Sequence, residues 1–269
     1  MDKLVRDGSV KDFEVRLVTK QGKFLDGMVT ASTWKDENGK VIANHEIMRD
    51  ITEQKENEAR IKASLEEKEI LLKEINHRVK NNLQIISCLL SLQGREIQDP
   101  VVLQYFKNSQ ERIKAMALVH EKLYQSQDLA RIEFSDYLKT LAKDLRSSYG
   151  IDARNVQLNI EAESMLLSVD IAIPCGLIVN ELISNSLKHA FPNNRSGLIS
   201  VEAHTADGKH TLIVKGDGVG LHKDFDIRSA KSLGLTIITA LSGQLGGKVE
   251  TENQDGANFC ITFPVDIMD

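Results

Sequence analysis

Residues 51–93 constrain the fold most, because they contain no glycine or proline and predict one long helix. Within it, two sets of positions recur every seven residues and predict the seam of a parallel coiled coil. These sets are Ile51, Glu58, Leu65, Leu72 and Val79, and Gln54, Ile61, Lys68, Ile75 and Asn82. The polar members predict a weak seam, as expected for a parallel coiled coil that must shift rather than stay rigid.

A second amphipathic helix is predicted to begin at Asp99-Pro100, because Asp is a favoured N-cap and Pro a favoured first helical residue. Its apolar positions are Leu103, Phe106, Ile113, Met116, Val119 and Leu123. The two helices together predict a hairpin. A lone hairpin buries little apolar surface, so two chains are expected to pair as a four-helix bundle.

The regions on either side of the hairpin have strand patterns. Residues 8–50 predict a small antiparallel sheet, which we interpret as the end of a domain because three strands bury little on their own. From about Ser135 helices and strands alternate, which predicts helices covering a mixed sheet. The expected fold class is α+β: a short antiparallel β segment, a helical hairpin, and an α/β sandwich domain.

Composition excludes some classes of protein. The 269 residues carry a formal net charge of −5, so no global basic field attracts nucleic acid. The longest apolar run, "IAIPCGLIV", is too short to span a bilayer, and no stretch of the sequence resembles a signal peptide. Cys88, Cys175 and Cys260 are isolated in apolar surroundings, and we expect buried thiols in a reducing compartment rather than metal ligands.

His77 is predicted to lie on the face of the long helix that is turned away from the seam, where its imidazole would be exposed. A neutral imidazole is a usable nucleophile. Glu74 lies three residues earlier on the same face and can hold one ring nitrogen protonated while the other attacks. Taken alone, these residues also fit an ordinary solvated helix face.

The string "EINHRVKNNLQ" resembles the phosphoacceptor helix of a sensor histidine kinase subfamily related to the HWE kinases, and the resemblance covers residues 71–126. It implies that His77 is the phosphorylated residue. The other members of its box are Arg78, Lys80, Asn81 and Asn82. Many histidine kinases carry an acid directly after the histidine, where this chain has Arg78. Glu74 is therefore our hypothesis for the orienting carboxylate.

The segment "NELISNSLKHAF", residues 180–191, carries polar residues at helical spacing. They are Glu181, Asn185, Lys188 and His189. An Asn amide oxygen is a suitable ligand for Mg²⁺ that phosphates already bind, and a nearby lysine supplies positive charge. A polar helix face is also common on helices that are simply solvated.

This segment resembles the N box of Bergerat-fold ATPases, the superfamily shared by gyrase, heat-shock chaperones, mismatch-repair proteins and histidine kinases. The resemblance covers about residues 130–269 and implies ATP and Mg²⁺. It assigns Asn185 to Mg²⁺ and Lys188 to the phosphates, with His189 in the nucleotide site. Glu181 polarises water in hydrolysing relatives, and in a kinase it orders the metal's waters or assists the histidine.

Two glycine boxes follow the N box. The first box is matched by "GDGVG" (216–220), which resembles it, and the second by "SLGL" (232–235). We interpret the segment between them as a nucleotide lid, with Lys223, Arg228 and Lys231 near the phosphates. The order of the boxes carries this assignment, since single glycine turns are common. The nucleotide-binding residues expected from it are Gly216, Asp217, Gly218, Gly220, Leu221, Lys231, Gly234 and Leu235.

Gly216 departs from the family pattern. In the first box, D-x-G-x-G, the leading acid accepts a hydrogen bond from the exocyclic amine of adenine, and the alignment puts Gly216 at that acid. Asp217 is one residue later, and on a strand end this offset points a side chain the opposite way. Losing such a bond costs on the order of 2–3 kcal/mol, so we expect impaired ATP binding.

The segment "MRDITEQK", 48–55, resembles the end of a PAS sensor domain and its turn into a signalling helix. The expected domains are the C-terminal part of a PAS-like domain at 1–50, a coiled-coil helix at 51–70, a dimerisation and histidine phosphotransfer domain at 71–128, and a catalytic ATP-binding domain at 129–269.

These resemblances imply an ATP-dependent protein histidine kinase, a homodimeric phosphotransferase that autophosphorylates His77 and passes the phosphoryl group to an aspartate of a response regulator receiver domain. The alternative is a kinase-deficient dimeric scaffold with a degenerate ATP site. An ATPase that drives a clamp is disfavoured, because the histidine-bearing hairpin precedes the domain. We expect a cytoplasmic chain, or the cytoplasmic portion of a longer membrane-anchored sensor.

Overall fold

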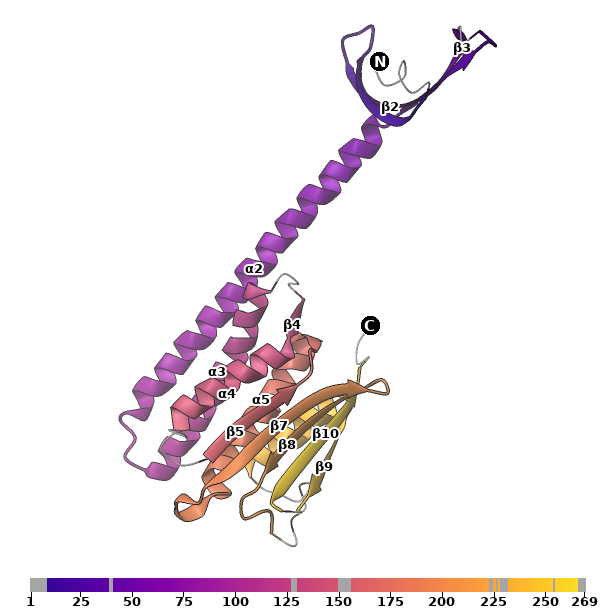
Figure 1. Cartoon of the computed structure of the whole chain (residues 1–269). Helices are drawn as coiled ribbons and strands as arrows, with labels where there is room; N and C mark the ends of the chain where they lie inside the picture. The colour runs from indigo at the N-terminus through magenta and orange to yellow at the C-terminus, as the bar shows by residue number, and fades with distance from the viewer. Residues whose placement is uncertain are drawn as a thin grey trace. The chain divides into compact units, whose positions relative to one another are not determined.

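The structure is a computed structural model, and it describes residues 9–38, 41–126, 130–149, 156–222, 225, 227, 232–253 and 255–265. The chain divides into two compact units, Met1–Leu71 and Leu72–Asp269. Helix α2 (Thr52–Gly94) begins in the first unit and continues into the second without a break (Figure 1). The long helix predicted from residues 51–93 is therefore confirmed.

The first unit is a three-stranded antiparallel sheet of β1 (Ser9–Val18), β2 (Phe24–Lys35) and β3 (Val41–Asp50), in the order β1-β2-β3. This confirms the predicted sheet. Its identity as part of a PAS domain stays a prediction.

Helix α2 starts from this sheet through a short network of hydrogen bonds. The Asp50 carboxylate accepts from the Thr52 amide at 2.9 Å, and the Thr52 hydroxyl accepts from the Asp26 amide at 2.9 Å. Ile51 is buried between them, and its amide donates to the Asp26 carbonyl at 2.8 Å. The hydrogen bonds from Thr52 lower the pKa of Asp50. Local contacts therefore fix where the helix leaves the sheet.

The second unit opens with the predicted hairpin of α2 and α3 (Pro100–Gln125). The Asp99 side chain accepts from two backbone amides of the first turn, at 2.8 and 3.3 Å, which confirms the predicted cap. Gln110 of α3 donates to the Ser87 carbonyl of α2 at 3.0 Å, and Lys80 and Glu121 form an ion pair at 3.0 Å. These contacts set the register of the two antiparallel helices.

The rest of the second unit is a sheet with one layer of helices (Figure 1). Its strands, β5 (Val156–Ala162), β7 (Gly197–Ala206), β8 (Lys209–Gly216), β9 (Lys248–Glu252) and β10 (Ala257–Pro264), lie in the order β5-β7-β8-β10-β9. Only the β5–β7 pair is parallel. The helices are α4 (Phe134–Tyr149), α5 (Val169–His189) and α6 (Leu233–Gln244). This confirms the predicted mixed sheet, and the α+β fold class.

The second half of α3 belongs to the same apolar core as α4 and α5. Ala115, Val119 and Leu123 are buried in one cluster with Tyr137 of α4. The Tyr137 hydroxyl donates to the Ala115 carbonyl at 3.3 Å, and a Cβ on Gly176 of α5 would lie only 2.0 Å from that hydroxyl. The second helix of the hairpin therefore packs directly against the helix that carries the N box.

Some details differ from the sequence-based expectation. Strands β4 (Arg131–Glu133) and β6 (Leu166–Ser168) form a small extra sheet, and three residues each are too few to show a periodicity. A 3-10 turn, η2 (Pro192–Asn194), follows α5. The expectation of three buried cysteines is confirmed for Cys175, wrong for Cys88, which is exposed on α2, and only partly met by Cys260, which is half-buried. None of the helices in the described part of the chain is long and apolar enough to cross a membrane.

Candidate nucleotide and phosphoacceptor sites

Helix α5 presents the N box to a cavity of about 980 Å³. Glu181, Asn185, Lys188 and His189 all line this cavity, while Ile178, Leu182 and Ile183 are buried in the core. Glu181 is buried, Asn185 and Lys188 are half-buried, and His189 is exposed. The structure therefore brings the predicted N-box residues together on one wall.

The second glycine box places the N-terminus of α6 against the N box. A Cβ on Gly234 would lie 2.8 Å from Glu181 Oε2 and 3.4 Å from Asn185 Nδ2, so this close approach needs glycine. The Ser232 hydroxyl caps α6 by accepting from the Leu235 amide at 3.4 Å. Gly234 and Leu235 line the same cavity. The other free amides of this helix start are suited to phosphate oxygens.

The first glycine box packs on the end of α5. A Cβ on Gly218 would lie 2.3 Å from the Ala190 carbonyl oxygen, which also accepts from the Val219 amide at 3.0 Å. Gly220 and Leu221 line the cavity.

Asn253 holds this loop by two hydrogen bonds to the backbone of Leu221. Its side-chain oxygen accepts from the Leu221 amide at 2.8 Å, and its side-chain nitrogen donates to the Leu221 carbonyl at 2.7 Å. The sequence analysis missed Asn253, because this contact joins segments 32 residues apart and no motif marks it.

Gly216 and the residue after it point in opposite directions. A Cβ on Gly216 would meet only the Ser186 side chain, at 3.7 Å, and Ser186 lines the cavity. The Asp217 carboxylate instead accepts from the Leu198 amide of β7 at 2.7 Å. Asp217, expected among the nucleotide-binding residues, is thus turned away from the cavity. Of the predicted residues of this box, Gly216, Asp217 and Gly218 are not among the described residues that line the cavity, but a Cβ on Gly216 would point toward Ser186, which is.

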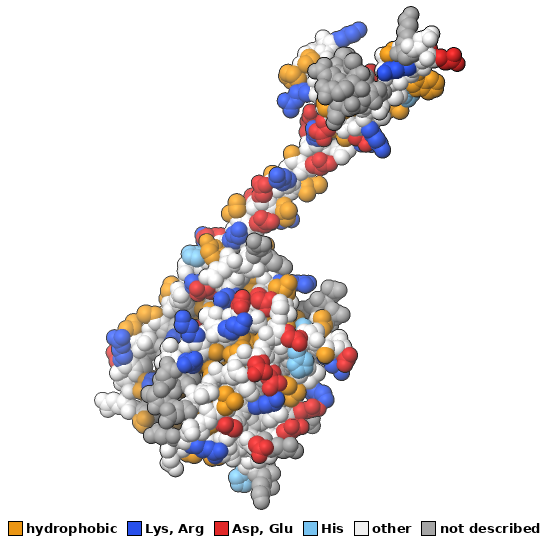
Figure 2. Space-filling model, viewed as in Figure 1, with side chains coloured by type: hydrophobic (Ala, Val, Ile, Leu, Met, Phe, Trp, Pro, Cys, Tyr) orange, Lys and Arg blue, Asp and Glu red, His pale blue; other side chains and the backbone are white. Residues whose placement is uncertain are grey.

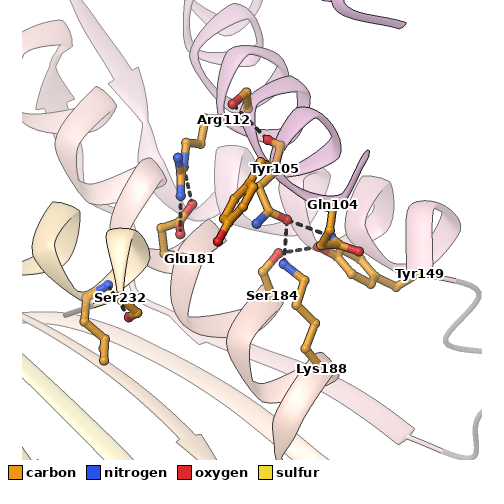
Figure 3. A network of polar contacts seen from close by, with 11 residues as sticks. Gln104, Tyr105, Arg112, Tyr149, Glu181, Ser184, Lys188 and Ser232 are labelled. Atoms are coloured by element: carbon orange, nitrogen blue, oxygen red, sulfur yellow. Dashed lines mark hydrogen bonds and ion pairs between the residues drawn. The ribbon is translucent and has the colours of Figure 1, made fainter. Parts of the chain in front are cut away.

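The opposite wall of the cavity comes from α3, which no motif predicted (Figure 3). Arg112 donates to both oxygens of Glu181, at 2.7 and 2.9 Å, and the two side chains are only 14% and 7% exposed. Lys188 Nζ donates to the Asn108 side-chain oxygen at 2.7 Å. Burial lowers the pKa of Lys188, and the nearby carboxylates of Glu181 and Glu111 partly oppose this shift.

The predicted lid lies largely outside the described residues, and Lys231, Lys223 and Arg228 fall there. Phe225, which is described, lines the cavity and meets the Phe259 ring edge-on at 6.4 Å between centroids. The end of the cavity near these two aromatic rings is apolar, as a flat base requires.

His77 is exposed on α2, as expected, with its ring 5.9 Å from the Tyr124 ring of α3. Its Nδ1 lies 3.4 Å from Asn81 Nδ2, whereas Glu74 is paired with Arg78 at 2.7 Å. The bond to Arg78 lowers the pKa of Glu74. The carboxylate expected to orient the imidazole is thus engaged elsewhere in this arrangement, and its role stays a prediction.

The residues beside His77 fix this part of α2 against α3. Asn76 is buried, and its side-chain oxygen lies 3.1 Å from His120 Nδ1. Burial lowers the pKa of His120, which favours its neutral form.

Comparison with known protein families identifies a family for both parts of the second unit, the hairpin and the sheet domain. A family profile described as "Histidine kinase" matches residues 74–149, and one described as "Histidine kinase-, DNA gyrase B-, and HSP90-like ATPase" matches residues 171–267. The fold and the site thus define a histidine kinase core, a helical hairpin followed by an ATPase-type domain. The chain carries an HWE-type histidine kinase hairpin and an ATPase domain of the histidine kinase type, which confirms the resemblance seen in the sequence.

Individual relatives agree with this assignment. Sensor histidine kinase PdtaS of Mycobacterium tuberculosis is 29% identical over 223 residues, which are 81% of this chain and 43% of that protein. Blue-light-activated histidine kinase 2 of Erythrobacter litoralis is 29% identical over 205 residues, 72% of this chain and 57% of the relative. The chain thus spans about half the length of these relatives.

Solved structures show the same fold. The histidine kinase domain from the Erythrobacter litoralis EL346 blue-light activated histidine kinase superposes with a TM-score of 0.56 at 26% identity, covering 72% of this chain and 90% of that one.

Proposed function

We propose that this chain is an ATP-dependent protein histidine kinase that phosphorylates His77 and passes the phosphoryl group to an aspartate of a response regulator. The observation that carries this proposal is the convergence of Glu181, Asn185, Lys188 and Gly234 on one cavity, in the same unit as the exposed His77. The two family matches support it.

The residues of the cavity suit a magnesium nucleotide. The Asn185 amide oxygen would hold Mg²⁺, whose charge would neutralise the phosphates. Lys188 and the amides at the start of α6 would bind phosphate oxygens. A His77 ring nitrogen would form the bond to the γ-phosphorus while the bond to the β–γ bridging oxygen breaks and ADP leaves.

The proposed kinase is a homodimer through the hairpin and the coiled coil. Apolar side chains of the predicted seam are exposed along α2 in the single chain (Figure 2): Ile61 is 68% exposed and Leu65 56%. Leu72 and Ile75 of the same seam are also exposed. A second copy would cover these side chains, which favours pairing through this face.

A second candidate function is a kinase-deficient dimeric scaffold. It is favoured by one observation, that Gly216 offers no carboxylate to the base and Asp217 is turned away. The two candidates differ in nucleotide affinity, since the hairpin and the phosphate-binding residues are the same in both.

Transfer of label from γ-labelled ATP to the chain tests the proposal. We expect labelling that is lost in His77→Gln, kept in the exposed control His45→Gln, and stronger in Gly216→Asp. Labelling of Gly216→Asp alone would support the scaffold for the natural chain. Absence of His77-dependent label even in Gly216→Asp would contradict the kinase proposal.

A further inference from the structure

The phosphate-binding residues of α5 are already engaged by side chains of α3. Both carboxylate oxygens of Glu181 accept from Arg112, and Lys188 donates to Asn108. Asn108 is itself held by Gln104, whose side-chain amide donates to the same oxygen at 2.8 Å. Figure 3 shows these contacts side by side where α3 faces α5. In the proposed nucleotide complex Lys188 would bind phosphate oxygens and Glu181 would order the waters of the metal, so both side chains would have to leave their α3 partners.

In this arrangement the phosphate-binding residues lie far from His77. The imidazole lies beside Tyr124, and Arg112 is twelve residues earlier on α3. At 1.5 Å per residue the two levels are about 18 Å apart along the helix. A second copy paired through a parallel bundle would carry its own His77 at the same level. Phosphoryl transfer needs direct contact, so neither histidine can be reached from here.

We propose that Arg112 and Asn108 form an autoinhibitory clamp that holds the ATPase-type domain away from the phosphoacceptor histidine, and that the metal nucleotide releases it by competing for Glu181 and Lys188. The proposal rests on the proposed kinase function. The apolar contact around Ala115 and Tyr137 also holds α3 against α5, but it touches none of the N-box polar atoms. The clamp is therefore the ligand-sensitive part of this interface.

Electrostatics makes the clamp depend on the metal. Glu181 is 7% exposed, and losing Arg112 without a substitute would leave a buried carboxylate unpaired, which is strongly unfavourable. Mg²⁺ near Asn185 supplies positive charge close to that carboxylate, so release costs less when the metal is present. Because coupling is reciprocal, a clamp opposed by nucleotide binding must itself lower nucleotide affinity.

The test compares Arg112→Gln with Lys107→Gln, which removes the same charge from an exposed position of α3 outside the cavity. Both are made in a Gly216→Asp chain, so that affinity is measurable. Affinity for a non-hydrolysable ATP analogue with Mg²⁺ is measured by calorimetry, and amide exchange is followed in residues 100–112 and 181–189. We expect Arg112→Gln to bind about fivefold tighter or more and to exchange faster, with Arg112→Lys intermediate and Lys107→Gln unchanged.

Unchanged affinity in Arg112→Gln would overturn the clamp, and weaker binding would show instead that Arg112 is a phosphate ligand. If Arg112→Gln fails to fold, Asn108→Ala gives the same readout, because it removes the contact to Lys188, together with the hydrogen bond from Gln104 within α3, and leaves the Arg112–Glu181 pair in place. It must then bind the analogue more tightly, or the clamp is rejected. Neither measurement uses phosphoryl transfer. If the affinities of the variants change as expected but His77 is never labelled, the kinase proposal is refuted and the clamp proposal stands.

Discussion

The two ends of the proposed nucleotide cavity depend on different structural features: one on close packing and the other on a single side chain. At the phosphate end, Glu181 and Asn185 lie within contact distance of the position that a Cβ on Gly234 would take. At the base end, Gly216 leaves space that only Ser186 approaches, at 3.7 Å. The proposed phosphate end thus lies where α5 and α6 approach closely, whereas we predict that base recognition depends on an acid that the family carries where this chain has Gly216.

This difference explains how fold and activity can separate. A Cβ at Gly234 would lie 2.8 Å from Glu181 Oε2, so a substitution there requires a shift of the Glu181 side chain, which Arg112 holds. A Cβ at Gly216 would make an ordinary van der Waals contact with Ser186. Packing therefore constrains substitution at Gly234 more than the addition of a Cβ at Gly216.

The largest expected effect comes from removing the metal ligand at the phosphate end. In a Gly216→Asp chain, Asn185→Ala should reduce His77 labelling by on the order of 100-fold, since the hard oxygen that holds Mg²⁺ is gone. Calorimetry supplies the control: affinity for the nucleotide without Mg²⁺ should change little, while the gain on adding Mg²⁺ should disappear. If that gain survives, Asn185 is not the metal ligand.

The N box could be predicted from sequence because its residues follow one another on a single helix and match a motif. The clamp could not, because Arg112 and Glu181 are 69 residues apart and meet only through the packing of α3 on α5. The surroundings of His77 could likewise be predicted only in part from the sequence. Its exposed face follows from the heptad pattern, whereas the choice of Glu74 between His77 and Arg78 depends on rotamers that no spacing specifies.

The second prediction restores the base end. Gly216→Asp should bind ATP about 10- to 100-fold more tightly, because it supplies the acid that accepts from the adenine amine in the first glycine box of the family. The Cβ fits at 3.7 Å from Ser186, so no loss of folding is expected. Inosine triphosphate is the matched control, since its base has a carbonyl in place of that amine. If the affinity rises equally for both nucleotides, or does not rise for ATP, then the side chain at position 216 does not recognise the adenine amine.

The smallest effect concerns the loop that joins the two ends. Asn253→Ala removes both hydrogen bonds to the backbone of Leu221, and since Asn253 is exposed, water replaces much of what is lost. We expect the free energy of unfolding to fall by about 1 kcal/mol, measured by denaturant titration, with Asn159→Ala on β5 as an exposed control that should change it less. Nucleotide affinity should fall by a smaller factor than Gly216→Asp raises it, because the loop shapes the cavity without contacting the base amine. A larger loss of affinity than of stability would mean that the loop, and not the missing acid, limits binding at the base end.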